Sequence, residues 1–239
     1  MELFAALKSV TALFFPDGCV VCGKATDDAA MCAGCREKIG YIREPICPRC
    51  GRPFASGKGV SHICLDCVNG ENKFIMSRAV FEYNEAIAKL IQRFKFGDRV
   101  SLVSFFADEL EKLYGIQYRG AGVDALVPVP LSRQRLRRRS YNQSLLLANA
   151  LAERLSLPVY PHVLEKVIET PPQSKLSAEM RRENVKHAYN VSDGKPLKGK
   201  KVLLIDDVVT TGSTINACTR AFRRAGIKQV YVMAVAMRV

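Results

Sequence analysis

The stretch Val202-Leu-Leu-Ile-Asp-Asp-Val-Val-Thr-Thr-Gly-Ser-Thr214 decides the fold of this 239-residue chain. Its first four residues are apolar without alternation, a pattern typical of a strand buried on both faces of a parallel sheet. The acids Asp206 and Asp207 follow, then a loop of small hydroxyl residues and one glycine, and residues 215–225 have the pattern of a helix. The stretch therefore predicts a strand, a loop and a helix of an α/β fold.

The residues after this strand predict a sugar-phosphate site. Ligands of parallel sheets bind at the carboxyl ends of the strands. Two acids at such an end suit the hydroxyls of a sugar, and a loop of backbone N–H groups and hydroxyls before a helix suits a phosphate. Together they indicate a site for ribose 5-phosphate. The alternative is a generic strand, turn and helix with acids at the end of the strand.

The same thirteen residues resemble the motif with which type I phosphoribosyltransferases bind 5-phosphoribosyl 1-diphosphate (PRPP). That motif is a hydrophobic strand, an acid and an Asp, two aliphatic residues and Thr-Thr-Gly-x-Thr, and every position here fits it. The resemblance implies that Asp206 and Asp207 face the ribose 2′- and 3′-hydroxyls and the Mg²⁺ that accompanies PRPP. It also implies a 5′-phosphate loop made of Thr210, Thr211, Gly212, Ser213 and Thr214.

Eight of the nine cysteines form four Cys-x-x-Cys pairs. Tetrahedral zinc takes four ligands, and each such turn supplies two thiolates. Four pairs therefore predict two Zn²⁺ sites, which would be structural because four thiolates close each site. With sequential pairing, one site takes Cys19, Cys22, Cys32 and Cys35, and the other takes Cys47, Cys50, Cys64 and Cys67.

Other interpretations of these cysteines are open at the level of sequence. A crossed arrangement would join the first pair with the third and the second with the fourth. An iron–sulfur cluster also binds four cysteines. Disulfides are disfavoured because no secretion signal is visible, and redox pairs normally lie at a helix start within a βαβ unit, whereas these pairs lie among Gly, Pro and Asp.

The net charge of +13 indicates phosphate-rich partners such as nucleotides or nucleic acid. Residues 1–76 contain nine Lys/Arg and eight Asp/Glu, whereas residues 77–239 contain 27 and 15. We expect residues 1–76 to form an N-terminal helix and a double zinc ribbon, and residues 77–239 to form a phosphoribosyltransferase-like domain. No apolar run reaches the ~18 residues of a membrane span, so we expect no transmembrane segment.

Strand and helix patterns alternate after the cysteine-rich segment. Strands are expected at 78–83, 124–130, 163–167, 201–205 and 229–236, and helices at 85–96, 102–114, 141–155 and 215–225. This alternation predicts a parallel α/β sheet flanked by helices. Together with the resemblance, it predicts the type I phosphoribosyltransferase fold preceded by a double zinc ribbon.

Three further segments resemble the ComF proteins, a subgroup that joins a double zinc ribbon to a phosphoribosyltransferase domain. They are Leu90-Ile-Gln-Arg-Phe-Lys-Phe-Gly-Asp98, Val127-Pro-Val-Pro-Leu131 with Arg137-Arg-Arg-Ser-Tyr-Asn-Gln143, and Thr170-Pro-Pro-Gln-Ser-Lys-Leu-Ser177 with Arg181-Arg-Glu-Asn184. The resemblance covers nearly the whole chain. It implies a cytoplasmic role in DNA uptake, with single-stranded DNA and a helicase-like competence protein as partners.

The second segment is rich in arginine, whose guanidinium group matches phosphate oxygens. By analogy with the family's pyrophosphate loop, Val129, Pro130, Leu131, Ser132 and Arg133 would face the diphosphate of PRPP. The other arginines form either a solvated basic turn or a track for a nucleic-acid backbone, and the tyrosine either stacks a base or packs in the core. The candidate nucleic-acid residues are Arg135, Arg137, Arg138, Arg139 and Tyr141.

The third segment lies where type I phosphoribosyltransferases have a flexible hood over the site. A closing hood expels water from the reacting sugar, and it would bring Lys175, Arg181 and Arg182 to the diphosphate. The alternative is a plain surface loop with a helix over residues 177–185.

Two functions fit these patterns. As an enzyme, the protein would transfer the phosphoribosyl group of PRPP to an acceptor that no residue identifies, with diphosphate leaving together with Mg²⁺. As a binding protein, it would hold PRPP and single-stranded DNA during DNA uptake. We expect a PRPP-binding, zinc-ribbon protein of the competence type, with transferase activity on an unidentified small molecule as the alternative.

Overall fold

The computed structural model describes residues 18–26, 31–55, 57–70, 72–96, 101–168 and 188–239. The helix expected near the N-terminus and the hood residues Lys175, Arg181 and Arg182 lie outside the described residues.

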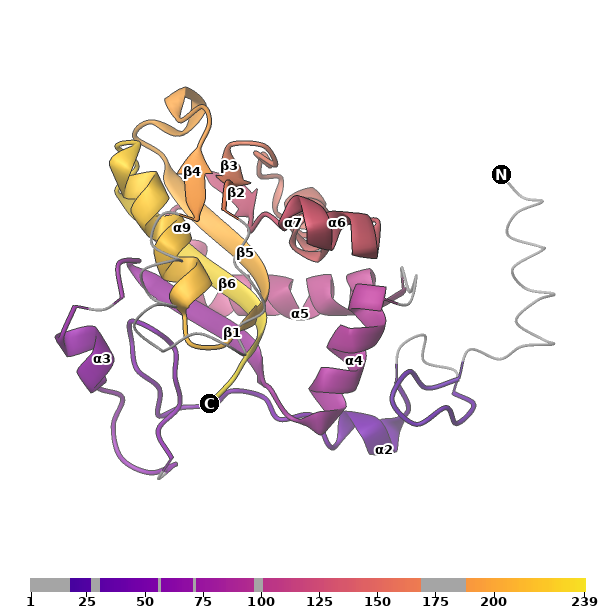
Figure 1. Cartoon of the computed structure of the whole chain (residues 1–239). Coiled ribbons are helices and arrows are strands. Elements are labelled where there is room, and N and C mark those ends of the chain that lie inside the picture. Colours follow the sequence, from indigo (N-terminus) through magenta and orange to yellow (C-terminus); the bar gives the residue numbers. More distant parts are fainter. Residues whose placement is uncertain (1–17, 27–30, 56, 71, 97–100, 169–187) are drawn as a thin grey trace.

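A four-stranded parallel sheet with the strand order β1-β6-β5-β2 forms the centre of the molecule (Figure 1). Its strands are β1 (Met76–Glu82), β2 (Ala125–Pro128), β5 (Lys201–Val209) and β6 (Gln229–Met237). Because β5 lies between β2 and β6, Ile205 is aligned with Pro128 on one side and with Met233 on the other. The expected parallel α/β sheet is confirmed.

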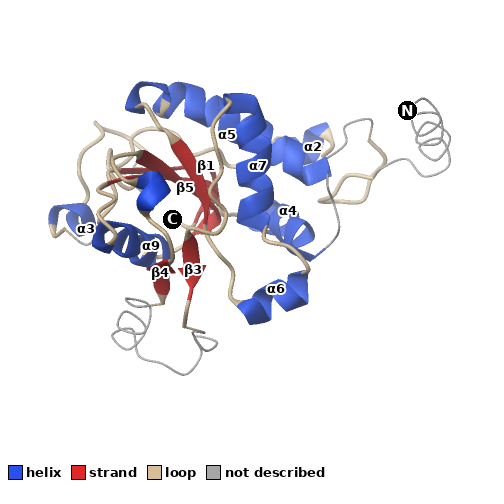
Figure 2. Ribbon diagram, turned by 90° about the horizontal axis from the view of Figure 1, so that it is seen from above, coloured by secondary structure: helices blue, strands red, loops and turns tan. Residues whose placement is uncertain are grey.

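Helices cover both faces of β5, which explains its unbroken run of apolar residues. Leu203 and Ile205 belong to a core shared with α4 (Glu85–Phe96), α5 (Ser101–Gln117) and α7 (Gln143–Leu155). Val202 and Leu204 belong to the opposite core, which α9 (Ser213–Arg224) covers. All four residues are fully buried. Figure 2 shows α4, α5 and α7 together on one side of the sheet and α9 on the other.

Two elements of the site differ from the sequence-based expectation. Strand β5 does not end at Ile205, because Asp206 and Val208 still pair with β6, so both acids lie within the strand. Helix α7 begins at Gln143, two residues later than expected. The Asn142 side chain accepts the Ser144 N–H at 3.0 Å, which caps the helix there.

The strand expected at 163–167 exists but lies outside the central sheet. It is β3 (Leu164–Lys166), and it pairs antiparallel with β4 (Tyr189–Val191) in a separate two-stranded sheet. A parallel bridge between Leu126 and Val159 occupies the outer edge of β2, so β3 does not pair there.

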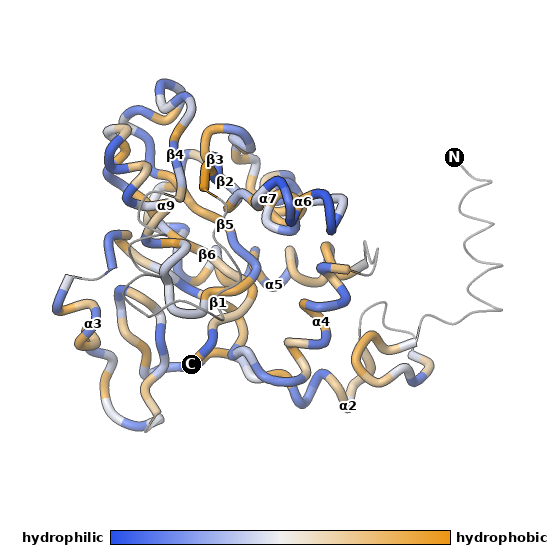
Figure 3. The backbone as a smooth tube through the Cα atoms, viewed as in Figure 1, coloured by the Kyte–Doolittle hydropathy of each residue, from blue (hydrophilic) through white to orange (hydrophobic). Residues whose placement is uncertain are grey.

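The remaining described elements are short. The cysteine-rich segment contains the one-turn helices α2 (Ala33–Arg36) and α3 (Leu65–Val68), and single 3-10 turns occur at η1 (Arg119–Ala121) and η3 (Lys195–Leu197). Helix α6 (Arg133–Arg139) follows β2 and is strongly hydrophilic (Figure 3). No described helix combines the length and the hydrophobicity needed to cross a bilayer.

Candidate functional site

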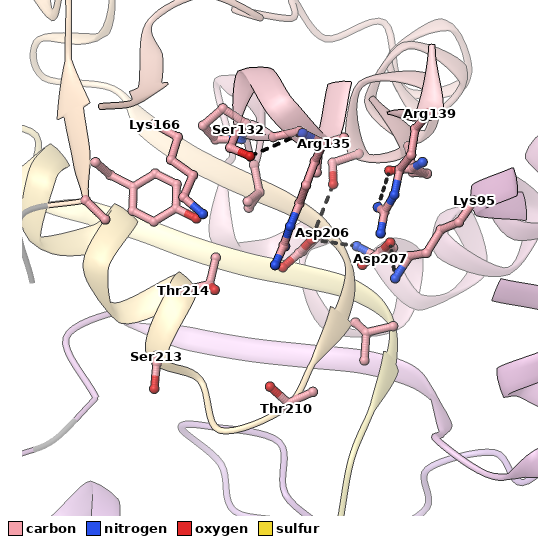
Figure 4. A pocket seen from close by; sticks show the side chains of 18 of the residues that line it. Lys95, Ser132, Arg135, Arg139, Lys166, Asp206, Asp207, Thr210, Ser213 and Thr214 are labelled. Carbon is pink, nitrogen blue, oxygen red and sulfur yellow. Dashed lines mark hydrogen bonds and ion pairs between the residues drawn. The ribbon is translucent and has the colours of Figure 1, made fainter. Parts of the chain in front are cut away.

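A pocket of about 370 Å³ lies at the carboxyl end of β5, and we call it the β5 pocket (Figure 4). Its walls include the end of β5, the loop before α9, the segment between β2 and α6, one face of α6, the start of α7, and residues of α4, β3 and β4. Segments far apart in the sequence meet here because parallel strands place their carboxyl ends at one edge of the sheet.

Two adjacent carboxylates form the centre of the β5 pocket. Asp206 is 8% exposed and accepts hydrogen bonds from the Ser144 hydroxyl at 3.3 Å and from the Asp207 backbone N–H at 2.8 Å. Burial, followed by the charge of Asp207, raises the pKa of Asp206 to about 7. A buried carboxylate beside a second one needs compensating positive charge. Carboxylate oxygens are also the ligands that Mg²⁺ prefers, so this pair fits the ion that accompanies PRPP.

Part of the compensating charge comes from Lys95 on α4. Its Nζ lies 2.8 Å from a carboxylate oxygen of Asp207, and the two side chains are 19% and 13% exposed. Sequence reasoning assigned no role to this lysine, although it lies in the Leu90–Asp98 segment that resembles ComF proteins. A helical pattern places Lys95 on α4 but does not indicate that the last turn of α4 reaches the end of β5.

The arginine-rich segment is a helix and not the turn that we considered from the sequence. Ser132 caps α6, its hydroxyl accepting the Arg135 N–H at 3.3 Å. Residues four apart share a helix face, and Arg135 and Arg139 accordingly both line the β5 pocket. Burial lowers the pKa of Arg139, an effect that the charge of Asp207 opposes, and the guanidinium donates to Gln143 at 3.1 Å.

The expected pyrophosphate loop only partly lines the β5 pocket. Val129, Pro130, Leu131 and Ser132 contribute to the wall, but Arg133 does not. Arg133 instead lines a neighbouring hollow of about 910 Å³, which we call the side hollow. Tyr141 lines the same hollow, and its hydroxyl donates to the Phe94 carbonyl. Of the expected nucleic-acid residues, Arg135 and Arg139 therefore line the β5 pocket, whereas Arg137 and Arg138 are exposed on α6.

The loop before α9 forms the opposite wall of the β5 pocket. Thr210, Thr211, Ser213 and Thr214 all line it. Gly212 caps α9 with a φ of 72°, a left-handed conformation that glycine adopts without strain. The Thr211 and Ser213 hydroxyl oxygens lie 2.8 Å apart. The first N–H groups of a twelve-residue helix thus follow a loop of hydroxyls, an arrangement suited to an anion.

Further pocket residues were not found from the sequence, and three of them carry polar side chains from separate elements. Ser144 belongs to α7, Lys166 to β3 and Tyr189 to β4. The last two reach the pocket through the small β3–β4 sheet, whose placement no local pattern indicates.

The eight paired cysteines form two clusters with sequential pairing. Cys19, Cys22, Cys32 and Cys35 make the first cluster, Cys47, Cys50, Cys64 and Cys67 make the second, and within each all sulfurs lie within 4.8 Å of one another. Tetrahedral zinc with Zn–S bonds of about 2.3 Å places its sulfurs about 3.8 Å apart. The Cys22–Cys32, Cys47–Cys67 and Cys50–Cys64 sulfur pairs are 3.7, 3.7 and 3.6 Å apart, which fits that geometry.

The two clusters lie on different parts of the molecule. The first packs into the core that contains α4 and α5, and α2 lies near α4 in Figure 1. The second packs into the core beneath α9, on the side where Figure 1 places α3. The ninth cysteine, Cys218, is fully buried within α9.

Comparison with known proteins gives two family matches. Residues 10–68 match the double zinc ribbon domain, and residues 142–238 match the phosphoribosyl transferase domain. Competence protein F of Haemophilus influenzae is 32% identical, with 93% of this chain and 98% of the relative covered. Competence protein ComFC of Bacillus subtilis is 29% identical (83% and 80%), and DNA utilization protein YhgH of Salmonella typhimurium is 31% identical (84% and 88%).

Metal analysis tests the two cysteine clusters. The purified chain should contain about two zinc ions, and Cys50→Ala should lower the content to about one because three thiolates no longer close the second site. Cys218→Ala is the matched control and should retain both ions, because Cys218 lies in neither cluster. Iron in place of zinc, or equal metal content in the two variants, would contradict the assignment.

The pKa of Asp206 predicts how stability depends on pH. Between the ordinary value of 3.8 and the folded value of about 7, the folded state holds a proton that the unfolded state has lost. The free energy of unfolding should therefore fall as pH rises through this window, by roughly 4 kcal/mol for a shift of about three pKa units. Asp206→Asn keeps an oxygen for Ser144 and should remove this fall.

Urea unfolding at pH 5, 6, 7 and 8 without added magnesium measures this effect. The exposed Asp193→Asn is the control and should follow the parent protein. Parallel curves for the parent and Asp206→Asn would show that the buried carboxyl does not set the pH dependence.

Proposed function

Because the chain belongs to the ComF family of competence proteins, we propose that it binds PRPP with Mg²⁺ in the β5 pocket and acts in DNA uptake. One observation carries the proposal. The two acids lie between the hydroxyl loop before α9 and a group of three cations, Lys95, Arg135 and Arg139 (Figure 4). PRPP has the matching order of groups, with a 5′-phosphate at one end, the ribose hydroxyls in the middle and a diphosphate on C1.

Each wall of the pocket has a separate task in this proposal. The N–H groups and hydroxyls of Thr210 to Thr214 bind the 5′-phosphate. Asp206 and Asp207 accept hydrogen bonds from the ribose hydroxyls. Arg135 and Arg139 point their forked guanidinium groups at the diphosphate, whose oxygens they match bidentately. Asp206 and Asp207 would also hold the Mg²⁺ that accompanies PRPP, and the ion would neutralise part of the diphosphate charge.

Lys95 links the two halves of this arrangement. Without ligand it is held by Asp207 at 2.8 Å. When the diphosphate arrives, its negative charge competes for the lysine, and Asp207 becomes free to accept ribose or magnesium. When magnesium binds to Asp207, both the lysine and the carboxylate have a partner of opposite charge, so the pocket does not leave a buried charge unpaired.

Transfer of the phosphoribosyl group is a second candidate function. The side hollow favours it, because it shares Pro130, Leu131 and Lys166 with the β5 pocket and offers about 910 Å³ next to that pocket. A nucleophile bound there would attack C1 as the bond to diphosphate breaks, and the cations would stabilise the leaving group.

Single-stranded DNA is proposed as the second ligand, on a smaller surface than the sequence suggested. Arg133, Arg137 and Arg138 are exposed on α6, and none of the three lines the β5 pocket. Exposed arginines of this kind can contact a phosphate backbone. Relatives whose names refer to competence and DNA utilization support this assignment.

Titration calorimetry with PRPP and Mg²⁺ tests the binding site. The parent should bind at micromolar to millimolar concentrations, and the double variant Asp206→Asn/Asp207→Asn should lose binding, because amides cannot replace two anionic acceptors next to magnesium. The Asp193→Asn variant should bind like the parent. Undiminished binding by the double variant would exclude this site.

A pair of lysines on one helix tests the role of Lys95. Lys95→Ala should weaken PRPP binding about 10- to 100-fold, as expected for the loss of ~1.5–3 kcal/mol from a charge-assisted hydrogen bond. Lys89→Ala removes the same charge from α4, but Lys89 pairs with the exposed Glu85 at 2.9 Å and should have little effect. Equal dissociation constants for the two variants would contradict the proposed exchange of partners.

The salt dependence of DNA binding tests the exposed arginines. In the variant Arg133→Ala/Arg137→Ala/Arg138→Ala, the slope of log affinity for single-stranded DNA against log salt should become shallower by about 2, while PRPP binding is retained. The exposed set Arg119→Ala/Lys195→Ala/Lys198→Ala removes the same charge elsewhere and serves as the control. An equal change of slope in both variants would show that net charge alone, and not the position of the α6 arginines, determines DNA binding.

A further inference from the structure

The loop before α9 separates two hollows. Thr210 and Thr211 line the β5 pocket, and both also line a smaller hollow on the other side, which we call the ribbon-side hollow. The far wall of that hollow contains Cys50 of the second cysteine cluster, together with Asn72 and Asn216. The β5 pocket, with its proposed ligand site, therefore lies on one side of the proposed phosphate loop. The second cysteine cluster lies on the other side, across the ribbon-side hollow.

A chain of hydrogen bonds connects these two sides. The Asn72 side-chain NH₂ group donates to the Cys67 sulfur at 3.1 Å, and the Asn72 oxygen accepts from the NH₂ group of Asn216 at 2.9 Å. The Asn216 oxygen in turn accepts the backbone N–H of Lys73 at 3.0 Å. Asn216 lies in the first turns of α9, and its own N–H donates to the Gly212 carbonyl at 2.8 Å.

The direction of every bond in this chain is determined by its ends. The Lys73 backbone N–H can only donate, so the Asn216 oxygen must face it, and the Asn216 NH₂ group must then face the oxygen of Asn72. The NH₂ group of Asn72 is thereby directed at Cys67, whose sulfur accepts best as a metal-bound thiolate. Asn216 is 8% exposed, so a broken link would leave buried polar groups without partners.

The second cluster is itself attached firmly to the central sheet. Gly51 packs so closely on β1 that an added Cβ would lie 2.5 Å from the Ser77 carbonyl oxygen, and its φ is 76°. The Ser77 N–H donates to the Arg49 carbonyl at 2.7 Å, and Arg78 donates to the Pro48 carbonyl at 2.9 Å. The second cysteine cluster is therefore fixed to β1, and the Asn72–Asn216 link joins α9 to this fixed cluster.

We propose that Asn72 and Asn216 are positioning residues that hold the phosphate loop against the second zinc site, so that zinc binding there and PRPP binding strengthen each other. The coupling between zinc and PRPP rests on the proposed PRPP function, whereas the hydrogen bonds of Asn72 and Asn216 exist without ligand. The link reaches the loop at Gly212, whose carbonyl accepts the Asn216 N–H at 2.8 Å. Coupling of this kind is reciprocal: zinc raises PRPP affinity by the factor by which PRPP raises zinc affinity.

Hydrogen–deuterium exchange of the zinc-loaded full chain tests the link without any ligand. In Asn72→Ala, the amides of residues 210–216 should exchange faster than in the parent, because the loop has lost its support. Asn69→Ala is the matched control, since Asn69 is an exposed asparagine of the same ribbon. Equal exchange of these amides in the two variants would overturn the inference, whether or not the protein binds PRPP.

Zinc release to a chromogenic chelator, with and without PRPP and Mg²⁺, tests the coupling. In the parent and in Asn69→Ala, PRPP should slow the release of one of the two ions. Asn72→Ala should still contain both ions, bind PRPP about tenfold more weakly and show no protection by PRPP. Protection in Asn72→Ala equal to that in the parent would overturn the coupling, whereas a parent that does not bind PRPP would overturn the proposed function and leave the exchange result to decide the link.

Discussion

The burial of two adjacent carboxylates at the end of β5 is the constraint on which the site depends. Asp206 is almost fully buried, and its pKa is raised because water has been replaced by protein and by the charge of Asp207. Such a pair persists only where positive charge and N–H donors compensate it. The sheet order places β2 beside β5, and the loop after β2 therefore brings α6 to the acids. Lys95 arrives independently, from the end of α4.

The second cysteine cluster constrains the site from the side of the phosphate loop. A loop that binds phosphate through backbone N–H groups must keep those groups aligned before the ligand arrives. The Thr210–Thr214 loop leads into α9, and Asn72 joins the first turn of α9 to the second cluster through its bonds to Asn216 and Cys67. The first cluster packs instead near α4 and α5. The two metal sites thus have different structural consequences, although their ligand sets are identical.

Most features that depend on neighbouring residues could be predicted from the sequence, whereas few contacts between distant segments could. The apolar run before Asp206 required a strand covered on both faces, and the alternation of Leu203 and Leu204 between two cores confirms this. Cys-x-x-Cys spacing predicted the clusters because four thiolates saturate zinc. Lys95, Lys166 and Asn72 were missed as partners of the site because their roles depend on the packing of separate segments. Which arginines of the arginine-rich segment face the pocket could not be predicted, because the segment was not recognised as a helix from the sequence.

A crystal structure of the full chain with PRPP and Mg²⁺ tests the account most directly. It should place the 5′-phosphate on the N–H groups of residues 211–214 and the ribose hydroxyls at the Asp206–Asp207 pair. The diphosphate should lie at Lys95, Arg135 and Arg139, with the Lys95–Asp207 contact of 2.8 Å lengthened or broken. A ligand bound in the opposite direction, or in the side hollow with that contact intact, would contradict the account.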